Sequence, residues 1–413
     1  MNLLRVALPL PLRRSFDYLA LDDTPLPPIG SRVSVRFGKT AMIGIVVEHP
    51  RASEIPTERL KPIQAALDTE ALLPPDLFAI LEWTARYYHH PIGEVFALGL
   101  PPALRQGQDP QRGPRGWILT EAGVLHFAAK PKRAPLQTRV AAQLSSEHPR
   151  SEDQLAEAFT DAGDWRAALR RMRDADLVKA VELDCLSNEA VTPDPPHALN
   201  TEQADALKAI HAADGFKAFL LDGITGSGKT EVYLHAIADV LEQGKQVLVL
   251  IPEIGLTPQT VQRFRARFHQ HSIALYHSGL SDGERSCTWQ AAREGRAQII
   301  IGTRSSIFLA FANLGLVIVD EEHDSSYKQQ EGLRYHARDL AVLRAQSATC
   351  PIVLGSATPS LESLHNANEA RYEAVHLRDR AGGASLPAFR LLDIRQQRMQ
   401  AGLSEPLLKE IRR

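Results

Sequence analysis

One segment restricts the possible folds of this chain more than any other: residues 223–230 read GITGSGKT. They satisfy the phosphate-binding pattern G-x-x-x-x-G-K-[ST] at every fixed position. The apolar run 219–221 before them is typical of a buried strand, and 230–243 after them is typical of a helix that Gly244 ends. A strand, a glycine-rich loop and a helix in this order indicate an α/β fold with a parallel sheet.

The same loop predicts ATP and Mg²⁺ as cofactors. Glycines let backbone N–H groups surround an anion, and the N-terminus of the following helix adds positive potential. We expect Lys229 to reach the β- and γ-phosphates and the hydroxyl of Thr230 to hold Mg²⁺. The alternative is a turn that binds nothing. The predicted nucleotide-binding residues of the loop are Gly223, Ile224, Thr225, Gly226, Ser227, Gly228, Lys229 and Thr230.

An acidic motif follows later in the chain. The apolar run 316–319 is typical of a central parallel strand, and it leads into the sequence DEEH at 320–323. A carboxylate at such a strand end can bind Mg²⁺, and the next residue can orient the attacking water. We therefore predict Asp320 as a metal ligand and Glu321 as a base, with Lys229 completing the catalytic set. The alternative is a strand end with solvated charges.

Three further strands are predicted, each followed by a polar loop. Residues 246–251 precede PEIGLT, 298–301 precede GTRSS, and 352–354 precede GSATPS. The carboxyl ends of parallel strands meet at one edge of a sheet, where ligands bind. We therefore expect all five loops on one functional edge.

In this order the segments GITGSGKT, PEIGLT, GTRSS, DEEH and GSATPS resemble the first motor lobe of a superfamily 2 helicase. The longer strings DGITGSGKTEVYL, LIPEIGLTPQ, YHSGLSDGER, DEEHDSSYKQ and RYHARDLA, with FDYL and YYHHPIGEVF near the N-terminus, resemble the PriA family of bacterial replication restart helicases (primosomal protein N-prime). The resemblance implies a RecA-like lobe preceded by a small β-rich DNA-binding domain and a winged-helix domain.

The resemblance also implies a function. The family's members are ATP-dependent DNA helicases that recognise stalled or abandoned forks, bind the nascent 3′ end and initiate primosome assembly. The implied partners are forked and single-stranded DNA, single-stranded DNA-binding protein and primosome or helicase-loading proteins. Zinc occurs in the family, but its cysteine ligands are not in this chain.

Further roles are carried over residue by residue. Gln203, in the segment LNTEQ, would contact adenine, although this segment is also a plausible helix start. The motif Ser356, Ala357 and Thr358 would couple ATP hydrolysis to DNA movement. An aromatic-rich segment would sense single-stranded DNA, because rings stack on bases and cations such as Arg338 meet phosphates. Its residues are Tyr327, Lys328, Arg334, Tyr335 and His336.

The first domain resembles the family's module that grips a 3′ DNA end. An aromatic ring can stack on the terminal base, an aspartate can accept a hydrogen bond from the 3′-hydroxyl, and a lysine can approach a phosphate. Without the resemblance, Phe16 and Tyr18 would be alternate positions of an ordinary strand. The positions implied are Phe16, Asp17, Tyr18, Gly38 and Lys61.

Residue patterns suggest the domain limits. Residues 1–105 alternate as short strands with Pro- and Gly-rich turns and contain a predicted helix at 75–88. Residues 106–114 and 187–198 are predicted linkers, and 199–413 would form the helicase lobe. Residues 115–186 predict helices followed by a strand, a winged-helix pattern. Its helix at 165–174 is rich in arginine, which indicates either a contact to DNA phosphates or a solvated face.

The composition is that of an ordinary globular protein, with 44% hydrophobic and 23% charged residues. A net charge of −2 means that DNA contacts would have to come from local basic clusters. Neither a signal peptide nor a membrane span is predicted. Three separated cysteines (Cys185, Cys287 and Cys350) predict free thiols, no zinc site and a cytoplasmic, nucleoid-associated protein.

The end of the sequence carries a separate expectation. A predicted helix start at 403–406 is followed by few residues before Arg413. We expect that a second motor lobe and its arginine finger are missing, so that this C-terminally truncated chain binds Mg-ATP weakly and hydrolyses it poorly, without unwinding. Two other functions stay open: a P-loop ATPase that is not a helicase, and a DNA-end-binding module whose motor lobe is only a scaffold.

Overall fold

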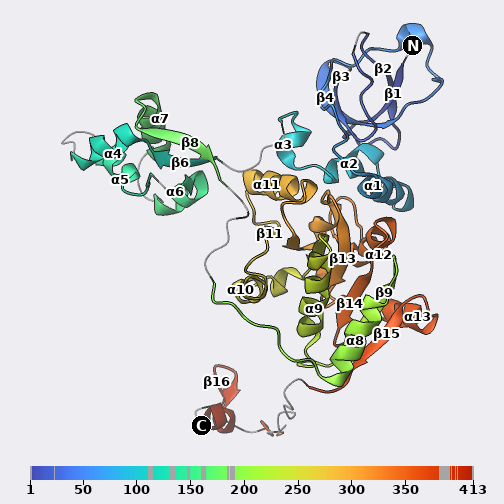
Figure 1. Ribbon diagram of the computed structural model, residues 1–413, viewed down its shortest axis with the longest axis vertical. Helices are drawn as coiled ribbons and strands as arrows, with labels where there is room; N and C mark the ends of the chain where they lie inside the picture. The colour runs from blue at the N-terminus through green and yellow to red at the C-terminus, as the bar shows by residue number, and fades with distance from the viewer. Residues whose placement is uncertain are drawn as a thin grey trace.

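The computed structural model describes residues 2–22, 24–109, 115–129, 135–146, 149–159, 164–183, 186, 191–380, 391, 393–395, 397 and 399–411. Figure 1 shows their arrangement, in which α1–α3 of the N-terminal segment lie between β1–β4 and the elements of the large parallel sheet. Among the helices in these ranges, none has the length and apolar character needed to cross a bilayer.

The N-terminal segment folds as a five-stranded antiparallel sheet followed by helices. Its strand order is β2-β1-β4-β3-β5. Alternate residues of the strands, such as Leu4 and Val6, are fully buried in a small core. The elements are β1 (Leu3–Ala7), β2 (Phe16–Leu19), β3 (Arg32–Phe37), β4 (Thr40–Glu48), η1 (Thr57–Arg59), β5 (Ala65–Ala66), α1 (Pro75–Tyr87), α2 (Ile92–Leu98) and α3 (Pro102–Arg105).

The middle segment has short helices around a three-stranded sheet ordered β7-β6-β8. Its core includes Trp117, Leu155, Trp165 and Met172. Ser151 and Gln154 form a capping box at the start of α6 (Glu152–Ala158). The elements are β6 (Arg115–Leu119), α4 (Glu121–Ala128), α5 (Pro135–Ala141), β7 (Arg150–Ser151), α6 (Glu152–Ala158), α7 (Trp165–Asp174) and β8 (Val178–Glu182).

The third segment contains the predicted parallel sheet. Its seven strands are all parallel, in the order β11-β12-β10-β13-β14-β9-β15. The elements are α8 (Thr201–His211), β9 (Ala218–Gly223), α9 (Lys229–Glu242), β10 (Gln246–Leu250), η2 (Glu253–Gly255), α10 (Pro258–Arg267), β11 (Ile273–Tyr276), α11 (Asp282–Arg293), β12 (Ile299–Gly302), η3 (Arg304–Phe308), β13 (Leu314–Val319), η4 (Ser325–Tyr327), α12 (Ala337–Ser347), β14 (Ile352–Ser356), α13 (Leu361–Asn368) and β15 (Glu373–Leu377). A short hairpin and helix follow: β16 (Met399–Gln400), β17 (Leu403–Ser404) and α14 (Glu405–Ile411).

Both faces of this sheet are covered, which explains its continuous apolar strands. Along β13, Leu316 and Ile318 pack with α8, α9 and α10 on one face. Val317 and Val319 face the opposite side, where α11 and α12 pack. Because all strands run the same way, their carboxyl ends, with the five polar loops, lie at one edge as the sequence predicts.

The N-terminal segment packs against this second face through α1, α2 and α3. A buried ion pair joins Arg344 of α12 to Asp76 of α1 over 2.9 Å. The indole Nε1 of Trp289 donates to the carbonyl of Gly99 over 2.8 Å. The backbone N–H of His336 donates to the hydroxyl of Tyr88 over 3.2 Å. The N-terminal segment and the large sheet therefore share one continuous core.

The cysteines differ from the expectation of free thiols. Cys350 is a buried free thiol, whose pKa burial raises to about 12. Cys287 is buried and disulfide-bonded. Cys185 lies outside the described residues.

Candidate functional site

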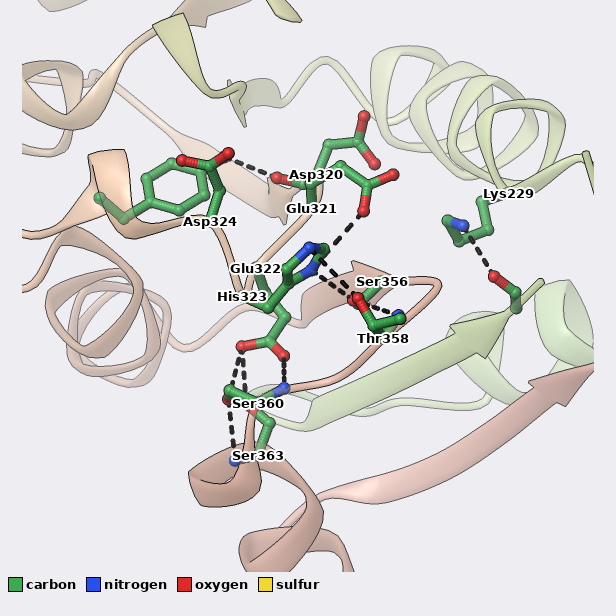
Figure 2. Close-up of polar contacts among 12 residues, drawn as sticks. Lys229, Asp320, Glu321, Glu322, His323, Asp324, Ser356, Thr358, Ser360 and Ser363 are labelled. Carbon is green, nitrogen blue, oxygen red and sulfur yellow. Dashed lines mark hydrogen bonds and ion pairs between the residues drawn. The ribbon is translucent and has the colours of Figure 1, made fainter. Parts of the chain in front are cut away.

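A hollow of about 670 Å³ lies at the carboxyl edge of the sheet, where β9 enters α9 and β13 ends. It brings together the loop residues from Thr225 to Thr230 with both predicted acids, Asp320 and Glu321. The predicted juxtaposition of Lys229 and Asp320 is therefore present, and Figure 2 shows their side chains on the same side of the sheet.

The loop has the conformation of a phosphate cradle. Gly226 and Gly228 adopt φ values of +81° and +83°, which favour glycine. Lys229 is 8% exposed, and its ammonium donates to the carbonyl of Gly223 over 2.8 Å (Figure 2). The hydroxyl of Ser227 is buried and has no hydrogen-bond partner among the described residues. A donor left unpaired inside a glycine-rich loop fits a phosphate group.

Asp320 is held in a low-dielectric position at the end of β13. Burial, followed by the nearby Glu321 carboxylate, raises the pKa of Asp320 above its usual value. The hydroxyl of Tyr233 donates to Asp320 over 3.1 Å and acts in the opposite direction, as does the charge of Lys229. A bound cation would stabilise this carboxylate further.

Thr230 and Asp320 fit a magnesium site. They line the same hollow and supply oxygen ligands, which Mg²⁺ prefers. No cluster of three or more His, Cys, Asp or Glu side chains suited to a metal occurs in the described ranges. Mg²⁺ usually keeps several waters and phosphate oxygens as ligands, so two protein ligands suffice.

Glu321 has an unusual backbone conformation. Its φ is +46°, in the left-handed region that non-glycine residues rarely adopt. Such strain concentrates where the surrounding structure fixes a functional side chain. Its carboxylate is partly exposed at the hollow, where it can accept a proton from a water molecule.

Gln203 lines the hollow from α8. Its side-chain amide donates to the carbonyl of Ser227 over 2.8 Å and accepts from the N–H of Asn200 over 2.9 Å. Gln203 therefore has both expected features: it caps the start of α8 and also contacts the phosphate loop. One donor and one acceptor site of the amide remain for a base.

The linker before α8 forms part of the hollow, which the sequence did not indicate. Asp194 and His197 line it. The N–H of His197 donates to Glu231, and Glu231 is in turn paired with Arg267 over 2.7 Å. Glu231 follows the phosphate loop directly, so this contact fixes the linker against the nucleotide site.

The predicted coupling motif contacts the DEEH sequence. His323 Nδ1 lies 2.6 Å from the Ser356 hydroxyl, and His323 Nε2 lies 3.3 Å from Thr358 Oγ1 (Figure 2). A direct polar connection therefore joins the ends of β13 and β14, with Ala357 between the two contact residues. His323 was not predicted as a site residue; its position directly after the two acids was the available signal.

Glu322 was also missed. Its side chain is fully buried and accepts hydrogen bonds from the N–H of Ser360 over 2.7 Å and from the hydroxyl of Ser363 over 2.8 Å (Figure 2). It also pairs with Arg338 over 3.1 Å. A buried carboxylate needs several such partners. In this conformation the guanidinium of Arg338 pairs with Glu322 and Asp339, and its contact to DNA phosphate stays a prediction.

The aromatic-rich segment is arranged differently from the expectation. Tyr327 is 1% and Tyr335 is 5% exposed, so neither ring can stack on a base in this conformation. The Tyr327 hydroxyl donates to the backbone carbonyl of Asp320 over 2.7 Å, so this tyrosine packs against the end of β13. Both rings belong to the apolar core. The sequence alone could not distinguish a core position from a base-stacking position for these two residues.

The polar residues of that segment stay at the surface. Arg334 is exposed, His336 is half-buried, and Lys328 donates to the carbonyl of Arg334 over 2.7 Å. The ammonium of Lys328 also lies 5.8 Å from the ring centroid of Tyr88. These side chains remain the DNA candidates of the segment.

Around β2, the structure places the residues implied for DNA-end binding near one another. Phe16 packs edge-on against Phe37 at 5.0 Å, beside Gly38, and the backbone of Lys61 accepts from Leu19 over 2.9 Å. Tyr18 is 5% exposed in the small core, so its ring is not available for stacking in this conformation.

Asp17 points away from that core. Arg5 donates to it over 2.9 Å and Ser53 over 2.7 Å. Although burial alone would raise it, these hydrogen bonds lower the pKa of Asp17 below its usual value, so it is a charged acceptor at neutral pH. Gly38 and Lys61 are exposed.

Comparison with known proteins adds two domain families. Residues 5–101 match the family described as the 3′ DNA-binding domain (3′BD), and residues 200–367 match the DEAD/DEAH box helicase family. A DEAD/DEAH box helicase domain implies the use of ATP and Mg²⁺.

Curated relatives cover the chain more fully. The replication restart protein PriA of Haemophilus influenzae is 41% identical over all of this chain and 57% of its own length. That of Chlamydia pneumoniae is 37% identical over 92% of this chain and 52% of its own length. The chain thus spans about half the length of the curated relatives it matches. Among solved structures, RecG bound to a three-way DNA junction aligns with 45% of this chain and 24% of its own, at 26% identity and a TM-score of 0.35.

Proposed function

We propose that this chain corresponds to the N-terminal part of the replication restart PriA helicases, through the first motor lobe, and that it acts on replication forks. In this proposal the N-terminal domain grips a nascent 3′ end, and the parallel-sheet lobe binds and hydrolyses Mg-ATP. The single observation that carries it is the presence of a 3′ DNA-binding domain and a DEAD/DEAH box helicase domain in one chain.

The nucleotide chemistry follows from the hollow. Mg-ATP supplies the reacting phosphoryl group when bound. The amides of the phosphate loop would orient it, Lys229 would bind its phosphates, and Thr230 and Asp320 would hold the metal. Glu321 orients a water molecule for attack. His323 transmits the state of the hollow to Ser356 and Thr358, which lie at the next strand end.

DNA recognition is assigned to two surfaces. Phe16, Asp17, Gly38 and Lys61 would receive the 3′-terminal nucleotide, with Asp17 accepting from the 3′-hydroxyl. Lys328, Arg334 and His336 would contact single-stranded DNA. The proposed partners also include single-stranded DNA-binding protein and primosome-loading proteins, and the proposed location is cytoplasmic and nucleoid-associated. These proposals rest on the similarity of this chain to its relatives. Zinc is not part of it, since no C-x-x-C pair occurs in the sequence.

The experiment is a titration of the chain with fluorescent forks that end in a 3′-hydroxyl or in a 3′-phosphate. A phosphate would face the Asp17 carboxylate, so we expect at least tenfold weaker binding of the phosphorylated fork. Asp17→Asn should reduce this preference, whereas Asp22→Asn, at a residue outside the site, should keep it. Equal binding of both forks by the unaltered chain would contradict the proposed end recognition.

A second candidate is a DNA-end-binding module in which the lobe acts only as a scaffold. The continuous core between α1–α3 and the large sheet favours it, because such an interface holds the two parts together without any nucleotide. Under this alternative, Lys229→Ala would leave fork binding unchanged, both with and without a non-hydrolysable ATP analogue.

A further inference from the structure

A second hollow, lined mainly by basic residues, lies on the N-terminal domain, away from the nucleotide site, and none of the DNA-binding residues assigned above lines it. It measures about 410 Å³ and opens between the β1–β2 loop and the end of α1. Arg13 and Arg14 line it from the loop, and Arg86 and His89 line it from the α1 side. The remaining lining residues are Ser15, Glu82, Ala85, His90 and Ile92.

The charges of this hollow are not neutralised. Arg13, Arg14 and Arg86 are exposed, and none of the three forms an ion pair with a residue in the described part of the chain. Glu82 is the one acid in the lining, against three arginines. The neighbouring Glu94 is already paired with His90 over 2.8 Å. A hollow with such an excess of positive charge favours an anion.

The wall on the α1 side is fixed. His89 adopts a φ of +49°, a conformation rare outside glycine. The residues on either side hold it there, since Tyr88 accepts a hydrogen bond from His336 and His90 is paired with Glu94. The turn that follows Arg86 is therefore a preorganised part of the surface rather than a loose chain end.

The hollow is continuous with the proposed DNA-end site. The guanidinium carbon of Arg14 lies 5.1 Å from the ring centroid of Phe16. Ser15 lines the hollow and is two residues from Asp17, a separation of at most about 7 Å along an extended chain. Neighbouring phosphates of one strand are spaced by about 3.4 Å or more along a helix axis. A strand that ends at Phe16 and Asp17 can thus place its next phosphates here.

We propose that this hollow binds the phosphodiester groups upstream of the 3′-terminal dinucleotide, beyond the one phosphate that the dinucleotide itself carries. Arg13, Arg14 and Arg86 donate hydrogen bonds to phosphate oxygens, and the planar guanidinium suits such bidentate contacts. Because sugars and phosphates are common to every sequence, this subsite adds affinity without sequence preference. The proposal rests on the function proposed above and extends that site from one nucleotide to a short strand.

The test compares the salt dependence of binding between two strands with a free 3′-hydroxyl, a dinucleotide and a longer oligonucleotide. The slope of log K against log salt is negative, and losing the neutralisation of one phosphate reduces its magnitude by about 0.7 for a single strand. We expect Arg86→Ala to lower the slope for the longer strand by about this amount and to weaken binding several-fold, with the dinucleotide unaffected. Arg86→Lys should restore much of the slope.

The matched control is Lys208→Ala on α8, an exposed position outside the hollow where the same charge is removed. If Lys208→Ala and Arg86→Ala lower the slope equally, or neither does, the subsite is wrong. The proposal would also be overturned if Arg86→Ala weakened the binding of an acidic peptide and left the salt dependence of DNA binding unchanged. The preference for a 3′-hydroxyl is measured separately in the unaltered chain, so failure of the end site and failure of this subsite give different results.

Discussion

The hydroxyl of Tyr233 donates a hydrogen bond to Oδ1 of Asp320 over 3.1 Å. Tyr233 comes from α9, the helix that begins with Lys229, whereas Asp320 follows β13. The contact is possible because residue 355 in β14 is glycine: a Cβ there would lie 1.5 Å from the tyrosine oxygen. A part-buried hydrogen bond therefore joins the helix of the phosphate loop to the acidic strand end.

Tyr233→Phe should weaken Mg²⁺-dependent nucleotide binding and make it more sensitive to acid. The hydrogen bond favours the charged form of Asp320, against the burial that raises its pKa. Without this bond the pKa rises further, so as the pH falls the carboxylate is protonated at a higher pH than in the unaltered chain. At neutral pH we expect about tenfold weaker binding.

Titrations of a fluorescent nucleotide with Mg²⁺ across a pH series measure this effect. Tyr276→Phe is the control, because Tyr276 lies in the same lobe but does not line the nucleotide hollow. Coincident pH curves for Tyr233→Phe and the unaltered chain would show that the hydrogen bond does not tune the metal ligand.

Gly355→Ala should displace Tyr233 and lower both stability and nucleotide affinity. The added methyl group collides with a buried ring, and overpacking of this kind costs about 1–3 kcal/mol. Chemical denaturation gives the stability, and nucleotide titration gives the affinity. Gly279→Ala is the control, since its Cβ would meet only His277 side-chain atoms, at 3.2 Å. An unchanged nucleotide affinity in Gly355→Ala would show that the position of Tyr233 does not affect the nucleotide site.

Ser356→Ala should leave nucleotide binding intact and reduce its response to DNA. Ser356 is fully buried and contacts His323, but it does not line the nucleotide hollow. We expect an affinity for Mg-nucleotide within twofold of the unaltered chain, and a smaller change in that affinity on adding single-stranded DNA. Ser325→Ala, at an exposed position, should keep the full change. An equal DNA effect in both variants would contradict a coupling role.

Arg344→Met should destabilise the chain by about 3–5 kcal/mol, because it leaves Asp76 without its buried partner. The double replacement of Arg344 by Met and Asp76 by Leu should cost much less, since no unpaired charge remains. Denaturant unfolding measures both. If the single and double variants are destabilised equally, the ion pair does not hold the N-terminal domain against the sheet.

The phosphate loop and the strand ends could be predicted because their residues follow local rules. Glycines at 226 and 228, the apolar run before them and the helix after them form one contiguous pattern. The apolar run 316–319 likewise identified a central strand, and parallel pairing then placed Asp320 beside Lys229.

What could not be predicted depends on burial. Tyr327 and Tyr335 have the composition of a stacking surface, yet tertiary packing turns both rings inward. Likewise, Tyr18 faces a core whose other members come from distant strands. The contacts of His323 with Ser356 and of Glu322 with Ser363 join segments more than 30 residues apart, a separation that no local pattern reports.

The most direct test of this account is calorimetric titration of the chain with a non-hydrolysable ATP analogue, with and without Mg²⁺, in the unaltered form and in Lys229→Ala and Asp320→Asn. We predict Mg²⁺-enhanced binding in the unaltered chain, weak binding in Lys229→Ala under either condition, and binding without the Mg²⁺ enhancement in Asp320→Asn. Equal, Mg²⁺-independent binding in all three would contradict the assignment of Lys229 and Asp320 to one nucleotide site.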